Sequence, residues 1–371
     1  MSARILASCS PGEIRIAVVQ DGVLLDYALH RPAAPDGVGD IHLGRIDAVL
    51  PALGGSFVAI GQESGFLPDK DGASGHGEGS LVGVRVTRSA QGGKGPRLSA
   101  ALTEAERGRL ARHDGTQGLV ARGPDALRRL TLAWPETPVE CDDAAVVARL
   151  RGPLGDRVRI VRLAFDDALE TVVEGLAQRD VALPGGLQAS IHPTPALVAI
   201  DMDGAGTSAE RRPKQTVQFA ANRAAIPGLM HQLRLRNLSG AILLDLAGLA
   251  SRKRAALAPD IEAALARDPL RPRLLGFTSL GLAEILRPRI HPPLHELLRS
   301  PLGAGLAALR AALALGGPLH APLAIRGSIA LVTALQADTE ALAEFTRRSL
   351  MPISLRMDPT LPELCWTIEN G

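Results

Sequence analysis

Five short stretches rich in Val, Ile, Leu and Phe follow one another between residues 39 and 102, and they constrain the fold more than any other part of the chain. They read DIHLGRIDAVL, GGSFVAIG, SGFLP, SLVGVRVTRS and GPRLSAAL, with glycine-rich turns between them. Short strands joined by tight turns can each pair with a close neighbour, which is typical of a small closed barrel. The pattern therefore predicts a five-stranded barrel of OB type.

The segments around this barrel mix strand and helix signals. The stretch EIRIAVVQDGVLLDYALH alternates apolar and polar residues on both sides of Asp-Gly, which predicts a hairpin over residues 13–30. Thr103 and Glu106 have the spacing of a capping box, and Gly115 marks the end of that helix. A chain of 371 residues is long enough for several domains, so we expect a multi-domain α+β protein.

Two apolar stretches, predicted as strands, run into acidic residues. In LVAIDMDGAG the acids are Asp201 and Asp203, and in GAILLDLAG the acid is Asp245. Ligands of α/β folds bind beyond the carboxyl ends of strands, so the three carboxylates are candidates for one site. Carboxylates with water and phosphate oxygens suit Mg²⁺, which can activate water for attack on a phosphate.

The charge around Asp245 is strongly positive although the whole chain is nearly neutral, with 41 Lys and Arg against 39 Asp and Glu. Asp245 is the single acid between residues 211 and 254. The nine basic residues of this stretch are Arg211, Arg212, Lys214, Arg223, Arg234, Arg236, Arg252, Lys253 and Arg254. Guanidinium groups beside a metal site can hold a nucleic-acid backbone, but an ion pair would equally explain a lone acid among arginines.

Two other interpretations of DMDGAG stay open at this point. Asp-x-Asp-Gly also occurs in haloacid-dehalogenase-type phosphatases, which normally have Thr or Val where this chain has Ala205. Alternatively, residues 201–206 form an Asx-type turn with no chemical role.

The predicted barrel carries candidate contacts for unpaired bases and phosphate. Phe57 and Phe66 are either part of its core, where Phe is usually found, or a platform on which unpaired bases stack. Lys94 and Arg97 lie among glycines in AQGGKGPRLS, where they either contact phosphate or belong to a solvated turn.

The remaining whole-chain features exclude several classes. Cys9, Cys141 and Cys365 are far apart in the sequence, so no close cysteine pair for a metal is predicted. No apolar run reaches the roughly 18 residues of a membrane helix, and the first residues lack an export signal. We therefore expect a cytoplasmic protein without a membrane span.

Motifs in the same order over nearly the whole chain resemble the ribonuclease E/G family. They are GDIHLGRIDAVLPALGGSFVAIGQESGFLP, GGKGPRLS, LPGGLQASIHPTPALVAIDMDGAG, QLRLRNLSGAILLDLAG, FTSLGLAEILRPR and MDPTLPELCWTI. The resemblance implies an OB-type barrel inserted in a ribonuclease-H-like domain, followed by a deoxyribonuclease-I-like catalytic domain. The implied boundaries are residues 1–36 and 151–184 for the ribonuclease-H-like domain, 37–102 for the barrel, 103–150 for a 5′-sensor-like region, 185–290 for the catalytic domain and 291–371 for a small carboxyl-terminal α+β domain.

The resemblance also implies roles for single residues. Asp201 and Asp245 match the family's catalytic acids and magnesium ligands, and Asp203 stands where the family usually has Asn. Phe57, Phe66 and Lys94 match the barrel positions that grip single-stranded RNA near the cut. Arg122 matches the arginine that senses a 5′-monophosphate, and Arg271 falls where the family has a basic residue near the scissile phosphate.

The implied activity is Mg²⁺-dependent cleavage inside single-stranded RNA that leaves 5′-phosphate and 3′-hydroxyl ends. Two departures from the family pattern qualify it. Gly123 replaces the sensor's usual Thr, which leaves 5′-monophosphate recognition open, and LLRSPLGAG lacks the cysteines of the family's zinc link, so a zinc-linked dimer is not expected. An RNA-binding protein of the same ancestry with weakened catalysis is the alternative.

Overall fold

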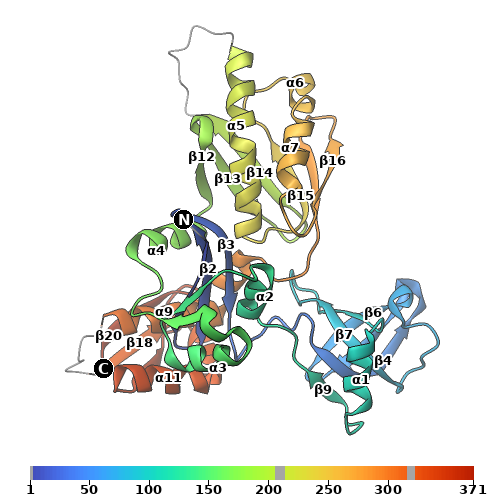
Figure 1. Cartoon of the computed structure of the whole chain (residues 1–371), viewed down its shortest axis with the longest axis vertical. Helices are drawn as coiled ribbons and strands as arrows, with labels where there is room; N and C mark the ends of the chain where they lie inside the picture. Colours follow the sequence, from blue (N-terminus) through green and yellow to red (C-terminus); the bar gives the residue numbers. More distant parts are fainter. Residues whose placement is uncertain (1–2, 205–213, 316–321) are drawn as a thin grey trace. The chain divides into compact units, whose positions relative to one another are not determined.

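The computed structural model describes residues 3–204, 214–315 and 322–371 (Figure 1). By its internal contacts the chain divides into two compact units. The first unit combines Met1–Pro35, Asp125–Val173 and Leu294–Gly371. The second combines Asp36–Pro124 and Glu174–Pro293. Across these described ranges, no helix has both the length and the apolar character needed to cross a bilayer.

The first unit contains a five-stranded sheet in the order β11-β10-β1-β2-β3. Strands β1, β2 and β3 form an antiparallel meander, and β10 and β11 extend it as parallel strands beside β1. The predicted hairpin is present: Asp21 and Gly22, both at positive φ, form the turn between β2 and β3. The elements of this part are β1 (Arg4–Ser10), β2 (Glu13–Gln20), β3 (Val23–His30), α2 (Ala126–Ala133), β10 (Val139–Cys141), α3 (Ala144–Leu154), β11 (Val158–Ile160) and α4 (Asp167–Gly175).

The carboxyl-terminal residues add a second sheet, with its own helices, to this unit. A three-stranded sheet in the order β19-β18-β20 packs against three helices through a shared apolar core that includes Leu306, Leu331 and Phe345. Its elements are α8 (Leu294–Leu298), α9 (Pro301–Ala314), β18 (Leu323–Gly327), α10 (Ile329–Ala337), α11 (Thr339–Ser349), β19 (Ile353–Met357) and β20 (Trp366–Asn370).

The second unit begins with the predicted barrel. Its strands follow the order β5-β6-β8-β7-β4, and pairing of β4 with β5 closes the ring, so the prediction of a five-stranded barrel is confirmed, and the barrel is consistent with the OB type. The strands are β4 (Ile41–Leu50), β5 (Gly55–Ile60), β6 (Glu63–Pro68), β7 (Leu81–Arg88) and β8 (Arg97–Ser99), with β9 (Gly118–Ala121) added beside β4. Helix α1 (Glu104–Ala111) starts with the predicted capping box of Thr103 and Glu106.

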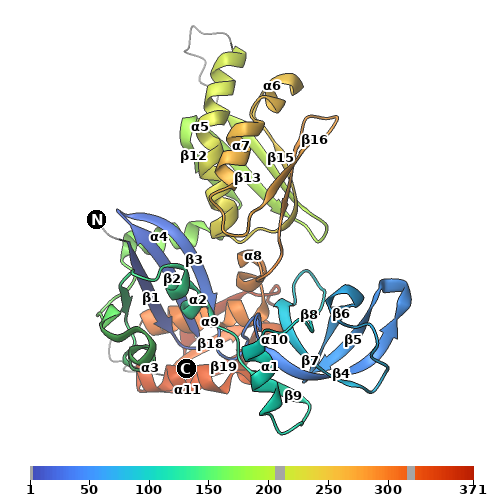
Figure 2. The ribbon, with the colours of Figure 1, turned by 45° about the vertical axis from the view of Figure 1, so that its right-hand side comes forward.

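The rest of the second unit is a six-stranded sheet in the order β12-β13-β14-β15-β17-β16. Helices α5 and α7 lie side by side along one of its faces (Figures 1 and 2). The bounds are β12 (Asp180–Leu183), β13 (Leu187–Pro193), β14 (Val198–Gly204), α5 (Lys214–Leu235), β15 (Gly240–Asp245), α6 (Ser251–Ala255), α7 (Ala258–Leu265), β16 (Arg273–Phe277) and β17 (Ala283–Arg287).

Alternation along β14 and β15 explains which face of this sheet packs against α5 and α7. Val198, Ile200 and Met202 are buried, and so are Ile242 and Leu244. These side chains belong to one apolar core with residues of α5 and α7. Because successive strand residues point to opposite faces, the residues between them point away from the helices.

The compact units divide the chain differently from the predicted boundaries. Residues 125–150, which were expected in a sensor-like region, supply α2, β10 and most of α3 to the first unit, where β10 pairs with β1. Residues 294–371 belong to that unit as well. The names given to the individual domains stay predictions.

Candidate active site

The three predicted site acids lie on the face of the β12–β17 sheet opposite α5 and α7. Asp201 and Asp203 are exposed and alternate along β14 with buried Ile200 and Met202. Asp245 is the last residue of β15. Strand β14 continues through both of its acids to Gly204, so Asp201–Gly204 is extended strand rather than the turn that one interpretation proposed. Ala205, Gly206, Arg211 and Arg212 lie outside the described residues.

Register brings Asp201 and Asp245 together. The two residues are direct partners in the parallel pairing of β14 with β15. Neighbouring strands lie about 4.8 Å apart, so the two carboxylates stand next to each other on one face. Asp203 is two residues further along β14, opposite Gln188 of β13, and its Oδ1 accepts a hydrogen bond from Gly204 N.

The same row of the sheet extends to two residues that the sequence did not single out. Asp180 of β12 is opposite Ser190 of β13, which is opposite Asp201. The Ser190 hydroxyl donates to Asp180 Oδ1, so both side chains are on the face that bears Asp201. The row across four strands therefore consists of Asp180, Ser190, Asp201 and Asp245. The sequence signal that could have predicted this row is the register of the two hairpins over residues 180–190 and 187–204.

Arg254 is the direct partner of Asp245. Its Nη1 donates to Asp245 Oδ1 over 2.5 Å, and its Nε donates to Leu249 O over 2.7 Å. The side chain of Arg254 is 15% exposed, whereas that of Asp245 is 44% exposed. Asp245 therefore forms the ion pair that one interpretation predicted, and it also lies beside Asp201.

The chain that follows Asp245 is fixed by a buried amide. Asn222 of α5 is fully buried. Its Nδ2 donates to Ala247 O over 2.9 Å, and its Oδ1 accepts from Ala247 N over 3.0 Å. A third bond joins Nδ2 to Gln218 O. One side chain thus pairs both backbone groups of a residue two positions after Asp245, which anchors the end of β15 to α5.

The aspartates suit a hard cation, although they do not form a closed cage. Mg²⁺ is commonly held by one or two carboxylates, with water filling its other positions, and the open sheet face offers two neighbouring carboxylates of this kind. Over the described ranges, the group of three or more ligand atoms within 4.8 Å of one another is Cys9, Cys141 and Asp142 rather than any set of the sheet aspartates. The prediction that the cysteines supply no close pair is wrong, because the fold brings together residues 132 positions apart.

The two phenylalanines of the barrel are outside its core. Phe57 and Phe66 are cross-strand partners in β5 and β6, and their rings meet edge to face with centroids 5.7 Å apart. Phe57 is 38% exposed, and the barrel core is formed instead by residues such as Ile46, Val58 and Leu67. The interpretation of these rings as core residues is therefore wrong, since strand alternation turns both outward.

Lys94, Arg97 and Arg271 all line one open pocket of about 770 Å³ in the second unit. Half of its fourteen described lining residues are lysine or arginine, and none of these fourteen is acidic. Arg97 also forms an ion pair with Asp71, with 3.1 Å between Nη2 and Oδ2. The backbone of Arg271 has a positive φ of 51°, which is strained for a residue with a side chain.

Arg88 shows how concentrated the positive charge of this pocket is. Burial lowers the pKa of its guanidinium, and the neighbouring Arg97 and Arg289 lower the pKa further. Within the described part of the chain, its buried Nε has no hydrogen-bond partner. An anion entering the pocket would relieve both the mutual repulsion and the unmatched donor.

Arg122 lies apart from that pocket, in the barrel. Its Nη1 donates to Asp40 Oδ2 over 2.6 Å, and Gly123 N donates to Asp40 Oδ1 over 2.7 Å. Asp40 itself is buried. An internal carboxylate therefore accepts one N–H of the Arg122 guanidinium and the backbone N–H of Gly123, while the Arg122 side chain is 61% exposed.

Comparison with known proteins finds a sequence family and several ribonucleases that are similar to this chain. Residues 154–290, which carry the β12–β17 sheet, match the sequence model of the Ribonuclease E/G family. Ribonuclease G of Escherichia coli strain K12 is 24% identical over 402 aligned residues, which cover 80% of this chain and 82% of that protein. Ribonuclease E of the same strain is 24% identical over 80% of this chain and 38% of its own length. Ribonuclease E of Synechocystis is 34% identical over 132 residues, 35% of this chain and 19% of its own.

A closed barrel and an acidic sheet face thus occur together in a chain that aligns with proteins named ribonucleases over most of its length. The resemblance of this chain to the ribonuclease E/G family therefore rests on the match over residues 154–290 and on 24% identity to ribonucleases G and E.

Proposed function

We propose that this protein is an endoribonuclease that uses Mg²⁺ to cut single-stranded RNA internally and leaves 5′-phosphate and 3′-hydroxyl ends. The observation that carries the proposal is the direct register of Asp201 with Asp245 on an open sheet face. The similarity to ribonucleases G and E supports it. We also infer that the parts of the fold correspond to the family's ribonuclease-H-like, OB-type and deoxyribonuclease-I-like domains.

Asp201 and Asp245 would hold the metal ion, with Asp203 as an oxygen acceptor beside them. Bound Mg²⁺ supplies polarisation of the phosphate and activation of water. Both residues lie on rigid, paired strands, so their carboxylates need little reorganisation when the ion and the RNA arrive.

Arg254 has two tasks in this proposal. In the structure its guanidinium balances the charge of Asp245. With Asp201 and Asp245 holding a cation, the guanidinium of Arg254, which Leu249 O also holds, would be available to a phosphate oxygen.

RNA binding would extend from this site to the barrel. Phe57 and Phe66 offer outward rings for base stacking, and the pocket lined by Lys94, Arg97 and Arg271 offers positive charge for the backbone. Gly240 and Ala241 of β15 line the pocket, whereas Asp245 ends the same strand. At about 3.3 Å per residue the pocket and the acids are roughly 16 Å apart, a span that requires several nucleotides.

The experiment that tests this proposal follows a 3′-end-labelled, single-stranded, AU-rich RNA with a 5′-hydroxyl end, incubated with the protein in Mg²⁺ or in EDTA. We expect internal cuts in Mg²⁺ only, and labelled products that a 5′-phosphate-dependent exonuclease degrades although it leaves the uncut RNA intact. RNA that is bound but intact under both conditions would instead identify the weakened, RNA-binding member of the family.

A further inference from the structure

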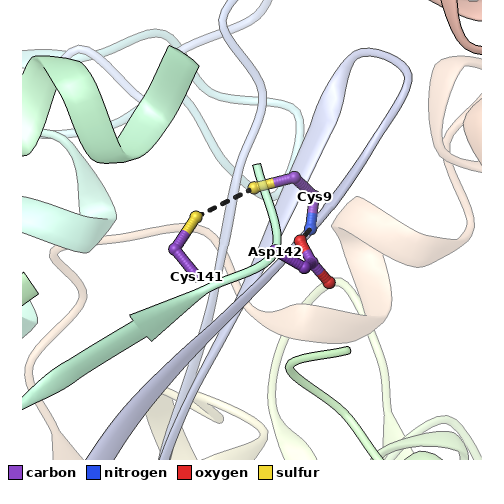
Figure 3. Close-up of side chains that lie close together, drawn as sticks. All are labelled: Cys9, Cys141 and Asp142. Atoms are coloured by element: carbon purple, nitrogen blue, oxygen red, sulfur yellow. Dashed lines mark hydrogen bonds between the residues drawn. The ribbon is translucent and has the colours of Figure 1, made fainter. Parts of the chain in front are cut away.

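Two cysteines of the first unit lie in contact although the sequence separates them widely. Cys9 is the penultimate residue of β1, and Cys141 is the last residue of the neighbouring parallel strand β10. Their Sγ atoms are 3.6 Å apart (Figure 3). Cys141 is fully buried and Cys9 is half-buried, so the pair is at the edge of the unit's core and not deep within it.

A carboxylate completes a group of three ligand atoms. Asp142 follows Cys141 directly, and one oxygen of its carboxylate lies within 4.8 Å of both sulfur atoms. Asp142 Oδ1 accepts a hydrogen bond of 2.7 Å from Cys9 N, and Oδ2 accepts a longer one from Ala164 N. Hydrogen bonds of this kind orient metal-ligating carboxylates in proteins, and each oxygen keeps a second lone pair for a cation.

We propose that Cys9, Cys141 and Asp142 bind a thiophilic divalent cation of the zinc type, with water as its fourth ligand. Two zinc–sulfur bonds of about 2.3 Å at a tetrahedral angle separate the sulfur atoms by about 3.8 Å, close to the spacing found here. The site would join the ends of β1 and β10, and it is independent of the proposed RNA cleavage.

The neighbouring charges agree with this assignment. Asp143, the next carboxylate along the chain, is not available, because Oδ1 caps α3 through Val146 N and Oδ2 accepts from Arg348. Arg348 also donates to Cys9 O, which fixes the backbone beside the sulfur. The third ligand is therefore Asp142, and two thiolates with one carboxylate give the negative charge that a divalent cation requires.

A disulfide is the competing outcome for two adjacent thiols. It would require the sulfur atoms to approach from 3.6 Å to about 2.05 Å, and both thiols would have to give their protons and electrons to an added oxidant. A cation requires almost no change in this separation and also accounts for the converging carboxylate. The geometry thus favours the metal.

Cobalt(II), whose thiolate bonds absorb in the near ultraviolet, is the probe for the test. The full chain carrying Cys365→Ser retains the pair and loses the exposed third cysteine. We expect it to bind one cobalt ion with a thiolate-to-cobalt band that zinc displaces. Cys9→Ser should reduce the band by about half, and Asp142→Asn should weaken cobalt binding by about 10- to 100-fold.

Outcomes that overturn the proposal are equally definite. Absence of a thiolate band in the Cys365→Ser chain would do so, as would loss of two mass units in air with no metal bound, which identifies a redox pair. If Cys9→Ser fails to fold, the unaltered chain still decides the matter: zinc must raise its thermal midpoint and slow alkylation of Cys9, with Cys365 reacting at its original rate.

Discussion

At the scale of single residues, Arg254 decides how strongly Asp245 can attract a metal ion. The guanidinium is 2.5 Å from the carboxylate and competes with any cation there. We predict that Arg254→Gln lowers the Mg²⁺ concentration for half-maximal cleavage several-fold and lowers the maximal rate about tenfold, because Asp245 and the phosphate lose a fixed partner. Steady-state cleavage over a magnesium titration measures both constants.

Arg267→Gln is the matched control for this prediction, because Arg267 is an exposed arginine two residues after the end of α7. It should leave both constants unchanged. If Arg254→Gln behaves like Arg267→Gln, the pair of Arg254 with Asp245 has no part in the reaction.

The acids of the site could be predicted from the sequence because an apolar strand pattern ends at each of them. The pairing of β14 with β15 then places Asp201 directly beside Asp245. Asp180 lies in the local hairpin of β12 and β13, whose register alone places it in the row of acids. The cysteine pair could not be predicted in the same way, since its two members come from distant segments. The outward position of Phe57 depends on which face of β5 meets the barrel core, and a single aromatic residue does not reveal that.

At the scale of elements, the end of β15 depends on α5 through Asn222. We predict that Asn222→Ala lowers the free energy of unfolding by about 2–3 kcal/mol, because the backbone N–H and C=O of Ala247 lose their partners while buried. Denaturant unfolding followed by far-ultraviolet circular dichroism measures the change. A loss below about 0.5 kcal/mol would show that water replaces the amide and that the anchor is dispensable.

The barrel offers a second test at this scale. Phe57→Ala removes an outward ring without opening the core, so we expect stability to change little and affinity for a short single-stranded RNA to fall about 5- to 100-fold. Fluorescence anisotropy measures the affinity. Leu53→Ala is the control, because Leu53 is an exposed apolar residue of the same barrel. Equal losses for both variants would argue against base stacking.

Most elements could be predicted from local signals, and the grouping of elements could not. The Asp-Gly turn, the capping box at Thr103 and the glycine-bounded strands are local, and all three are present in the structure. The union of β1 with β10, and of both with the carboxyl-terminal residues, depends on contacts between segments more than a hundred positions apart.

At the scale of the whole molecule, the pair of Arg122 with Asp40 bears on which RNA ends matter. Because Asp40 accepts both Arg122 and Gly123 N, we predict that RNAs with 5′-monophosphate and 5′-hydroxyl ends are cleaved within about twofold of each other. Competition between the two labelled RNAs in one reaction measures the ratio. A preference of tenfold or more for the monophosphate would contradict this account of the pair.

The central claim is that Asp201 and Asp245 together support magnesium-dependent cleavage. Its most direct test is the single-turnover rate of cutting of an internally labelled, single-stranded RNA by the unaltered chain, by Asp201→Asn with Asp245→Asn, and by Glu262→Gln, an exposed acid of α7. We predict that the double variant loses activity by about 100-fold or more while Glu262→Gln retains it. A double variant that folds and cuts RNA at the original rate would contradict the assignment of the active site to this sheet face.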